Sequence, residues 1–289
     1  VAAGRETSTY KFEMPPSIRA NAMRVDEALA AVKVCDPAVG SGAFPVGMMN
    51  EIVKAREVLS IYSQTSEGSV YDFKRECIEN SLYGVDIDPG AVEIAKLRLW
   101  LSLVVDEEDI HNIKPLPNLD YKLMRGNSLL GLPDGVLLNP EKLQELEERK
   151  KTYFDETNPS KKDDLRKEIN HLFEELVESA RQFDPTLGKV NFDFRTHFSE
   201  IFQEQGGFDV VIGNPPYGAK LNDLSKQFIT SNFQCFKGNF DIYSAFIQLA
   251  FQISTEDGFW SFINPVSWQS GENYIVLRRF LLQNGKLEI

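Results

Sequence analysis

The sequence contains little that would support a metal centre or a disulfide framework. It has 289 residues but only three cysteines and three histidines, and these are far apart: Cys35, Cys77, Cys235, His111, His171 and His197. No CxxC pair and no Cys/His spacing of a metal site is present. We therefore expect free, buried thiols and no metal ligands.

Long apolar runs are also missing. No stretch approaches the roughly 20 apolar residues of a membrane-spanning helix. The N-terminal segment 1–5 is too short and too polar for a signal peptide. We expect a cytoplasmic protein without membrane contact, because 42% hydrophobic and 26% charged residues are typical of a globular protein. The length allows one large α/β domain or two small ones.

Positive charge is in short supply. The sequence has 31 Lys and Arg against 43 Asp and Glu, a net charge of −12. This balance argues against the basic surface that nucleic-acid-binding proteins usually carry. The chain starts without Met, and its last residues, 285–289, resemble the start of a strand. We expect it to be a piece of a longer protein.

What the sequence does contain is an alternation of short apolar runs with helical periodicity. Helices are predicted over 46–53, 71–80, from Pro89 onward and over 243–254, where Tyr243 and Phe246 are expected in the core. Strands are predicted at 32–35, 82–86, 121–124, 208–212 and 259–263. This order predicts an α/β fold with a doubly wound, mainly parallel sheet.

Residues 140–182 interrupt this alternation. Two charged helical stretches flank Asn158-Pro159, and the second has one apolar stripe: Leu165, Ile169, Leu172, Phe173 and Leu176. We predict an inserted helical hairpin. It is either an arm that contacts DNA or a partner, or a solvated helix pair that packs on the sheet. The slight excess of acidic residues favours the second interpretation.

A glycine-containing loop, 36–44, follows the first predicted strand. Gly40 and Gly42 permit a tight turn and close approach of a ligand. Pro45 stands at the third glycine position of the dinucleotide fingerprint, and the loop has no P-loop lysine. An acidic residue at the strand end would repel phosphate. Asp36 suits instead the ammonium group of S-adenosylmethionine.

Further polar residues follow the next two strands. The Asp86 carboxylate is placed to accept hydrogen bonds from both hydroxyls of a ribose, and Ile87 to pack on an adenine ring. Asp88 is a candidate helix N-cap. Asn127 either reads the cofactor adenine or is a turn residue. Ligands of such sheets bind at the carboxyl ends of the strands, so the sequence predicts one cofactor site there.

Asn214-Pro215-Pro216-Tyr217 follows the fourth predicted strand. The prolines stiffen this segment and remove two N–H donors while leaving their carbonyls as acceptors. A rigid turn would not require the flanking Asn and Tyr. The Asn214 side-chain oxygen and the Pro215 carbonyl can bind both hydrogens of a planar amine and direct it at a methyl sulfonium. Tyr217 can stack on a base rotated out of a duplex.

These motifs resemble those of the gamma-class DNA adenine-N6 methyltransferases, especially the fused restriction–modification enzymes of type IIG. The matching segments are 36–44, 82–103, 126–130, 213–217 and 258–268. The resemblance implies a Rossmann-like S-adenosylmethionine-dependent methyltransferase fold. It also implies catalytic roles for Asn214, Pro215, Pro216 and Tyr217, and a double-stranded DNA partner with a flipped adenine. Further cofactor contacts are implied at Pro37, Ala38, Phe44 and Ser128.

The resemblance also concerns segments near and beyond the chain ends. In the family a Thr-Pro-containing segment closes over the cofactor, so residues 1–31 and Pro15 are expected to do so, although Met14 stands where Thr is usual. Target-recognition and nuclease domains are expected outside the chain. An acidic catalytic domain is then understandable if the basic DNA-gripping surface lies in those domains.

Two other functions stay open from the sequence. The same Asn-Pro-Pro-Tyr geometry serves methylation of a glutamine amide or of an RNA base amine. Met14 and the acidic charge are also compatible with a catalytically silent scaffold that binds nucleic acid or a partner protein.

Overall fold

A parallel five-stranded sheet organises the chain. The computed structural model describes residues 14–63, 68–105, 119–133, 135–136, 138–183, 190, 192–218, 220–237 and 241–285. The strands are β1 Val34–Asp36, β2 Leu82–Asp86, β3 Leu123–Arg125, β4 Phe208–Gly213 and β5 Ser254–Phe262. Their order is β3-β2-β1-β4-β5, and each neighbouring pair is parallel. The fold is therefore the doubly wound α/β fold predicted, and its direction of winding reverses between β1 and β4.

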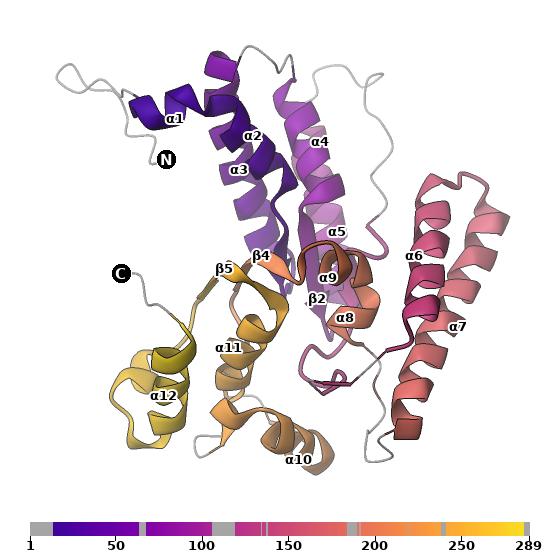
Figure 1. The fold of residues 1–289 in the computed structure, drawn as a ribbon, viewed down its shortest axis with the longest axis vertical. Helices are drawn as coiled ribbons and strands as arrows, with labels where there is room; N and C mark the ends of the chain where they lie inside the picture. The colour runs from indigo at the N-terminus through magenta and orange to yellow at the C-terminus, as the bar shows by residue number, and fades with distance from the viewer. Residues whose placement is uncertain are drawn as a thin grey trace.

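Helices cover both faces of this sheet (Figure 1). Those that precede the hairpin are α1 Pro16–Ala20, α2 Ala22–Ala31, α3 Ala43–Ser63, α4 Val70–Asn80 and α5 Pro89–Val104. The later ones are α6 Pro140–Asp155, α7 Pro159–Phe183, α8 Phe194–His197, α9 Ser199–Gln205, α10 Asp223–Asn232, α11 Ile242–Ile253 and α12 Ile275–Asn284. Within the described ranges, no helix is both long enough and apolar enough to cross a membrane.

Successive side chains of the strands point to opposite faces of the sheet and form two apolar clusters, one on each face. Leu82 joins the apolar cluster under α3, α4 and α5, whereas Tyr83, the next residue, joins the cluster under α8, α9 and α11. Successive side chains of a strand point to opposite faces, so β2 is buried on both sides. Tyr83 there packs edge-on against Phe198, with ring centroids 5.3 Å apart. Cys35, Cys77 and Cys235 are free and buried, as expected.

The predicted elements are confirmed, but the starts of three strands were wrong. β1 begins at Val34, two residues later than predicted. β3 begins at Leu123 because Tyr121 and Lys122 belong to a turn in which the Lys122 amide donates to the Leu119 carbonyl (3.1 Å). β5 begins at Ser254, earlier than expected, with an irregular register against Phe208 and Val210 that the apolar pattern does not reveal. The expected core residues Tyr243 and Phe246 are buried.

The predicted hairpin is formed by α6 and α7, but it packs at the edge of the sheet rather than on its face. It stands at the side of the molecule, beside α8 and α9 (Figure 1). Its apolar stripe closes over Tyr121, in the turn before β3. The Tyr153 hydroxyl donates to Asp120 (2.5 Å) and accepts from Arg166 (2.8 Å). These hydrogen bonds link the hairpin to the turn before β3, which contains Asp120.

Two leucines of α5 provide a test of the packing. Leu99 is 0% exposed and Leu97 is 51% exposed. We expect Leu99→Ala to lower the free energy of unfolding by about 2–5 kcal/mol, because it removes transfer energy and leaves a cavity. The matched Leu97→Ala should change it by less than about 0.5 kcal/mol. Denaturant titrations measure both, and equal losses would contradict the assigned faces of α5.

Candidate active site

The carboxyl ends of β1 and β4 meet at Asp36 and Gly213. β1 and β4 are paired in parallel, with Cys35 opposite Val211. A Cβ added to Gly213 would lie 2.6 Å from Asp36 Oδ1. Any larger residue at position 213 would therefore displace the Asp36 carboxylate, and the chain that continues into Asn214 starts directly beside it.

Asp36 is a buried carboxyl group with an incomplete set of partners. It is 1% exposed, and its Oδ1 accepts the Ala38 amide at 3.0 Å. Oδ2 is buried and has no hydrogen-bond partner in the described part of the chain. Burial, which the Ala38 hydrogen bond only partly offsets, raises the pKa of Asp36 from 3.8 to about 7, with a further rise from Asp86. A cationic group placed at Oδ2 would relieve this cost.

The glycine loop lies between the ends of β1 and β2. Gly40 and Gly42 have φ angles of +50° and +80°, a region where side chains are strained. A Cβ on Gly42 would also approach the Ala95 Cβ to 2.9 Å, so this glycine lets α3 pack closely on α5. Pro37 is buried, and Ala38 and the Phe44 ring are half-buried around the loop.

Asp86 closes the loop from the end of β2. Its Oδ2 accepts the Gly40 amide (2.8 Å) and its Oδ1 the Asp88 amide (2.9 Å). Each carboxylate oxygen has capacity for a further hydrogen bond, so Asp86 can still accept two hydroxyl groups. Ile87 beside it is 65% exposed. Asp88 caps α5 through the Gly90 amide (2.8 Å), which confirms its predicted role.

The loop after β3 completes this edge. Asn127 Oδ1 accepts the Leu129 amide (3.1 Å), the arrangement of a turn residue, while its NH₂ group has no partner among the described residues. Ser128 is buried and donates to the Pro37 carbonyl (2.6 Å). Ser128 therefore supports the glycine loop from behind, whereas Asn127 keeps two donors free.

Asn214-Pro215-Pro216-Tyr217 leaves the sheet on the other side of Asp36. Pro215 is buried, whereas Asn214 and Pro216 are exposed and Tyr217 is 56% exposed. Neither the Asn214 amide nor the Tyr217 hydroxyl has a hydrogen-bond partner in the described ranges. Gly218 follows with a φ of +66°, so the chain turns sharply after Tyr217. The motif thus exposes the Asn214 amide and the Tyr217 ring on a segment that two prolines stiffen and that starts at the end of β4.

The structure does not bring Pro15 to this edge, contrary to the prediction. Met14 is buried in an apolar cluster with Ala22 and Leu59. Leu59 lies 15 residues beyond Phe44 on α3, about 20 Å along the helix at about 1.5 Å per residue. The apolar Met14 side chain fixes Pro15 at the far end of α3. In the rest of the predicted closing segment, 1–31, residues 16–31 form α1 and α2, and residues 1–13 lie outside the described residues.

The contribution of Gly213 was not predicted from the sequence. Gly213 precedes the motif, and its missing side chain makes room for Asp36. Glycine at a strand end often marks such a close approach, and this was the available signal. Its partner, 177 positions earlier in the chain, was not predictable from the sequence.

Comparisons with known proteins agree with the family resemblance of the sequence motifs. The family model described as Eco57I restriction-modification methylase matches residues 80–289. A putative type II restriction enzyme and methyltransferase of Methanocaldococcus jannaschii is 29% identical over 88% of this chain and 27% of its own length. The adenine-specific methyltransferase BrxX of Escherichia coli is 23% identical over 94% of this chain and 24% of its own. The chain therefore spans about a quarter of these relatives.

A solved structure supports the fold. The ATP-dependent Type ISP restriction-modification enzyme LlaBIII, determined bound to DNA, aligns with a TM-score of 0.50 and 15% sequence identity. The alignment covers 96% of this chain and 16% of that one. At this identity the likeness concerns the fold alone.

The buried Asp36 carboxyl provides a pH-dependent test. Its raised pKa means that its stabilising contribution is complete below about pH 4 and is lost as the pH rises through about 7. We expect Asp36→Asn, which stays neutral, to raise the free energy of unfolding at pH 8 by about 4 kcal/mol and to change it little at pH 4. Urea titrations at both pH values measure this. The control Asp257→Asn, on exposed β5, should show no such gain, and an equal effect of Asp36→Asn at both pH values would contradict the assignment.

Proposed function

Because the chain belongs to the Eco57I restriction-modification methylase family, we propose that it performs the methyl-transfer step of a restriction–modification enzyme. Its proposed reaction moves a methyl group from S-adenosylmethionine to the N6 amine of an adenine in double-stranded DNA. The observation that carries this proposal is the junction at Asp36 and Gly213. It holds a buried, incompletely paired carboxyl directly beside the start of the Asn-Pro-Pro-Tyr segment, in which Asn214 and Tyr217 are exposed.

The residues at the edge of β1, β2 and β3 fit S-adenosylmethionine. Asp36 Oδ2 has no partner and suits the ammonium group of the methionine moiety. Asp86 has acceptor capacity for the ribose hydroxyls, Ile87 offers an apolar surface to the adenine ring, and the free NH₂ of Asn127 can donate to a ring nitrogen. When bound, this cofactor supplies an electrophilic methyl group on a sulfonium ion.

Asn214 and Pro215 position the amine that attacks. The lone pair of an exocyclic adenine amine is delocalised into the ring, so the amine is a poor nucleophile. The Asn214 side-chain oxygen and the Pro215 carbonyl accept its two hydrogens and direct the lone pair toward the methyl group. Positioning then supplies most of the rate enhancement, and no strong general base is required before the transfer.

Tyr217 receives the base. An adenine inside a duplex cannot reach these acceptors, so it must rotate out of the stack. Tyr217 lies three residues after Asn214 in the motif and is 56% exposed, so its ring is accessible for a base to stack on. Stacking on an aromatic ring of this kind contributes about 1–3 kcal/mol per base.

DNA is the favoured substrate over a glutamine side chain or an RNA base. The relatives are named as a restriction enzyme and methyltransferase and as an adenine-specific methyltransferase, which favours DNA over RNA. Stacking on Tyr217 favours a base over a glutamine side chain. The net charge of −12 predicts that this part of the enzyme adds little to the attraction of the DNA backbone.

The decisive variant is Asn214→Ala in the full-length protein. We expect the rate of methyl transfer to fall at least about a hundredfold, because the acceptor that orients the amine is lost. The affinity for S-adenosylmethionine should stay within about threefold of the wild-type value, since Asn214 is not one of the residues proposed to bind the cofactor at the ends of β1, β2 and β3. Mass spectrometry of nucleosides from digested DNA measures N6-methyladenine, and calorimetry measures cofactor binding.

Asn273→Ala is the matched control, because Asn273 is exposed and lies outside the motif. It should leave both quantities unchanged. Equal loss of transfer and of cofactor binding in Asn214→Ala would contradict the role given to Asn214. Methyl groups found on glutamine or in RNA instead of DNA would replace the proposed substrate, and a folded protein with no transfer to any of them would be a silent scaffold.

A further inference from the structure

A cavity of about 1000 Å³ opens at the end of the sheet opposite to the candidate active site. Its lining comes from residues that precede four strands, among them Lys33 before β1, Asn80 before β2, Lys122 before β3 and Glu204 before β4, and from helix α6 of the hairpin. Strand β2 separates the two ends of the sheet by about 17 Å, at about 3.3 Å per residue. The proposed methyl-transfer reaction does not use this cavity.

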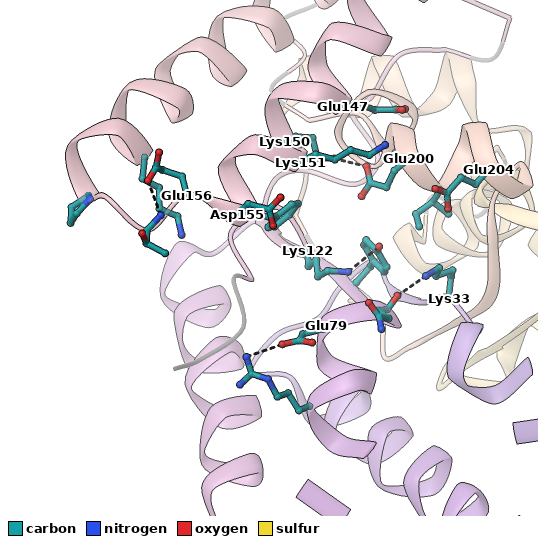
Figure 2. A pocket seen from close by; sticks show the side chains of 18 residues that line it. Lys33, Glu79, Lys122, Glu147, Lys150, Lys151, Asp155, Glu156, Glu200 and Glu204 are labelled. Atoms are coloured by element: carbon teal, nitrogen blue, oxygen red, sulfur yellow. Dashed lines mark hydrogen bonds and ion pairs between the residues drawn. The ribbon is translucent and has the colours of Figure 1, made fainter. Parts of the chain in front are cut away.

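Lys122 lies at the centre of the cavity. It is only 9% exposed, and Figure 2 shows its amine between Glu79 on one side and Glu200 on the other. The Lys122 Nζ donates to the Tyr83 hydroxyl oxygen at 3.0 Å. It also lies 4.2 Å from the centroid of the Tyr83 ring, in a cation–π contact.

This lysine has no carboxylate partner. In the described part of the chain no acidic oxygen lies within ion-pair distance of Lys122 Nζ. The two nearby carboxylates are engaged elsewhere: Glu200 pairs with Lys150, and Glu79 pairs with Arg75 at 2.9 Å. An ammonium group has three hydrogens and Tyr83 takes one. Two Lys122 hydrogens and the Tyr83 hydroxyl hydrogen therefore form a group of donors without an acceptor.

The surroundings are less acidic than the rest of the protein. Six basic and six acidic side chains line the cavity, whereas the whole chain has 31 basic and 43 acidic residues. The Lys33 Nζ donates to the Asn80 carbonyl (2.8 Å) and has no acidic partner within the described ranges, whereas the Lys33 backbone amide donates to Asp209 (2.8 Å). Glu147 has a buried Oε1 without a hydrogen-bond partner in the described part of the chain, and burial raises the pKa of this carboxyl.

We propose that this cavity is a binding site for a small molecule with an oxyanion group, a carboxylate or a phosphate, which Lys122 and Tyr83 hold together. The oxyanion supplies both the missing counter-charge and the missing acceptors. A buried charge without a partner is costly, and an anion removes that cost. The volume exceeds that of a bare phosphate ion, so the oxyanion belongs to a larger molecule whose other groups meet Glu147 and Lys33.

Binding of an anion is linked to the protonation of Lys122. Burial lowers the pKa of Lys122 from 10.5 to about 7. Glu200 and Glu79 raise it, whereas Lys33 and Lys150 lower it further. An anion binds the ammonium form, so the affinity is highest below pH 7 and falls about tenfold per pH unit above it. Binding at pH 8 takes up a proton.

The test uses the thermal midpoint of the whole chain in sodium phosphate and in sodium succinate, each against sodium chloride at equal ionic strength and pH 6.5. We expect the midpoint of the wild type to rise by about 3 °C at ten times the dissociation constant of the bound anion. Lys122→Met, which keeps the apolar stem, should lose this rise. The control Lys151→Met changes another lysine of the cavity lining and should retain it. A response to phosphate alone identifies a phosphate ester, and a response to succinate alone identifies a carboxylate.

A second measurement needs no variant. Acetylation of each lysine by acetic anhydride is followed by mass spectrometry, with and without the anion. The anion should slow acetylation of Lys122 at least about threefold and leave Lys151 unchanged. The proposal is wrong if neither anion shifts the wild-type midpoint more than chloride does, if Lys122→Met responds as strongly as the wild type, or if Lys122 is not protected.

Discussion

The close approach of the Asp36 carboxyl to Gly213 is the central constraint on the carboxyl edge of the sheet. It joins β1 to β4 at the point where the winding of the sheet reverses, which is where ligands of doubly wound folds bind. The carboxyl belongs to the edge that we propose as the cofactor site, and the glycine leads into Asn214. One close approach therefore sets the distance between the proposed methyl donor and the proposed acceptor.

Two further hydrogen bonds hold the loops of this edge in place. Asp86 ties the glycine loop to β2 through the Gly40 amide, and Ser128 ties the loop after β3 to the Pro37 carbonyl. Asp36 itself is left with one buried oxygen unpaired, at a cost to the stability of the folded chain above about pH 7. Such a cost at the centre of a candidate site is typical of a group that a ligand will satisfy.

Much of this arrangement was predictable because local chemistry determines it. Period-2 and period-3.6 patterns placed the strands and helices, and Asp36, Asp86, Asn127 and Asn214 fell at successive strand ends. Contacts between distant residues were not predictable. Lys122 and Tyr83 are 39 positions apart, and neither segment contains a sequence pattern that predicts a buried amine. Pro15 was misplaced because the burial of Met14 against Leu59, a tertiary contact, decided its position.

The two ends of the sheet thus have different chemistry. The carboxyl end presents acceptors and an aromatic ring, which suit a cationic cofactor and a planar base, whereas the amino end presents the donors of Lys122 and Tyr83. The two sites share no side chain, so each can be tested while the other is intact.

The most direct test of the central claim is a calorimetric titration of the chain with S-adenosylmethionine at pH 6, repeated in buffers of different ionisation enthalpy. If Asp36 Oδ2 accepts the ammonium group of the cofactor, binding lowers the pKa of Asp36 from about 7 and releases most of a proton. The heat of binding should then change with the buffer in the wild type, but not in Asp36→Asn if that variant still binds. Binding without proton release, or no binding by the folded chain, would contradict the account.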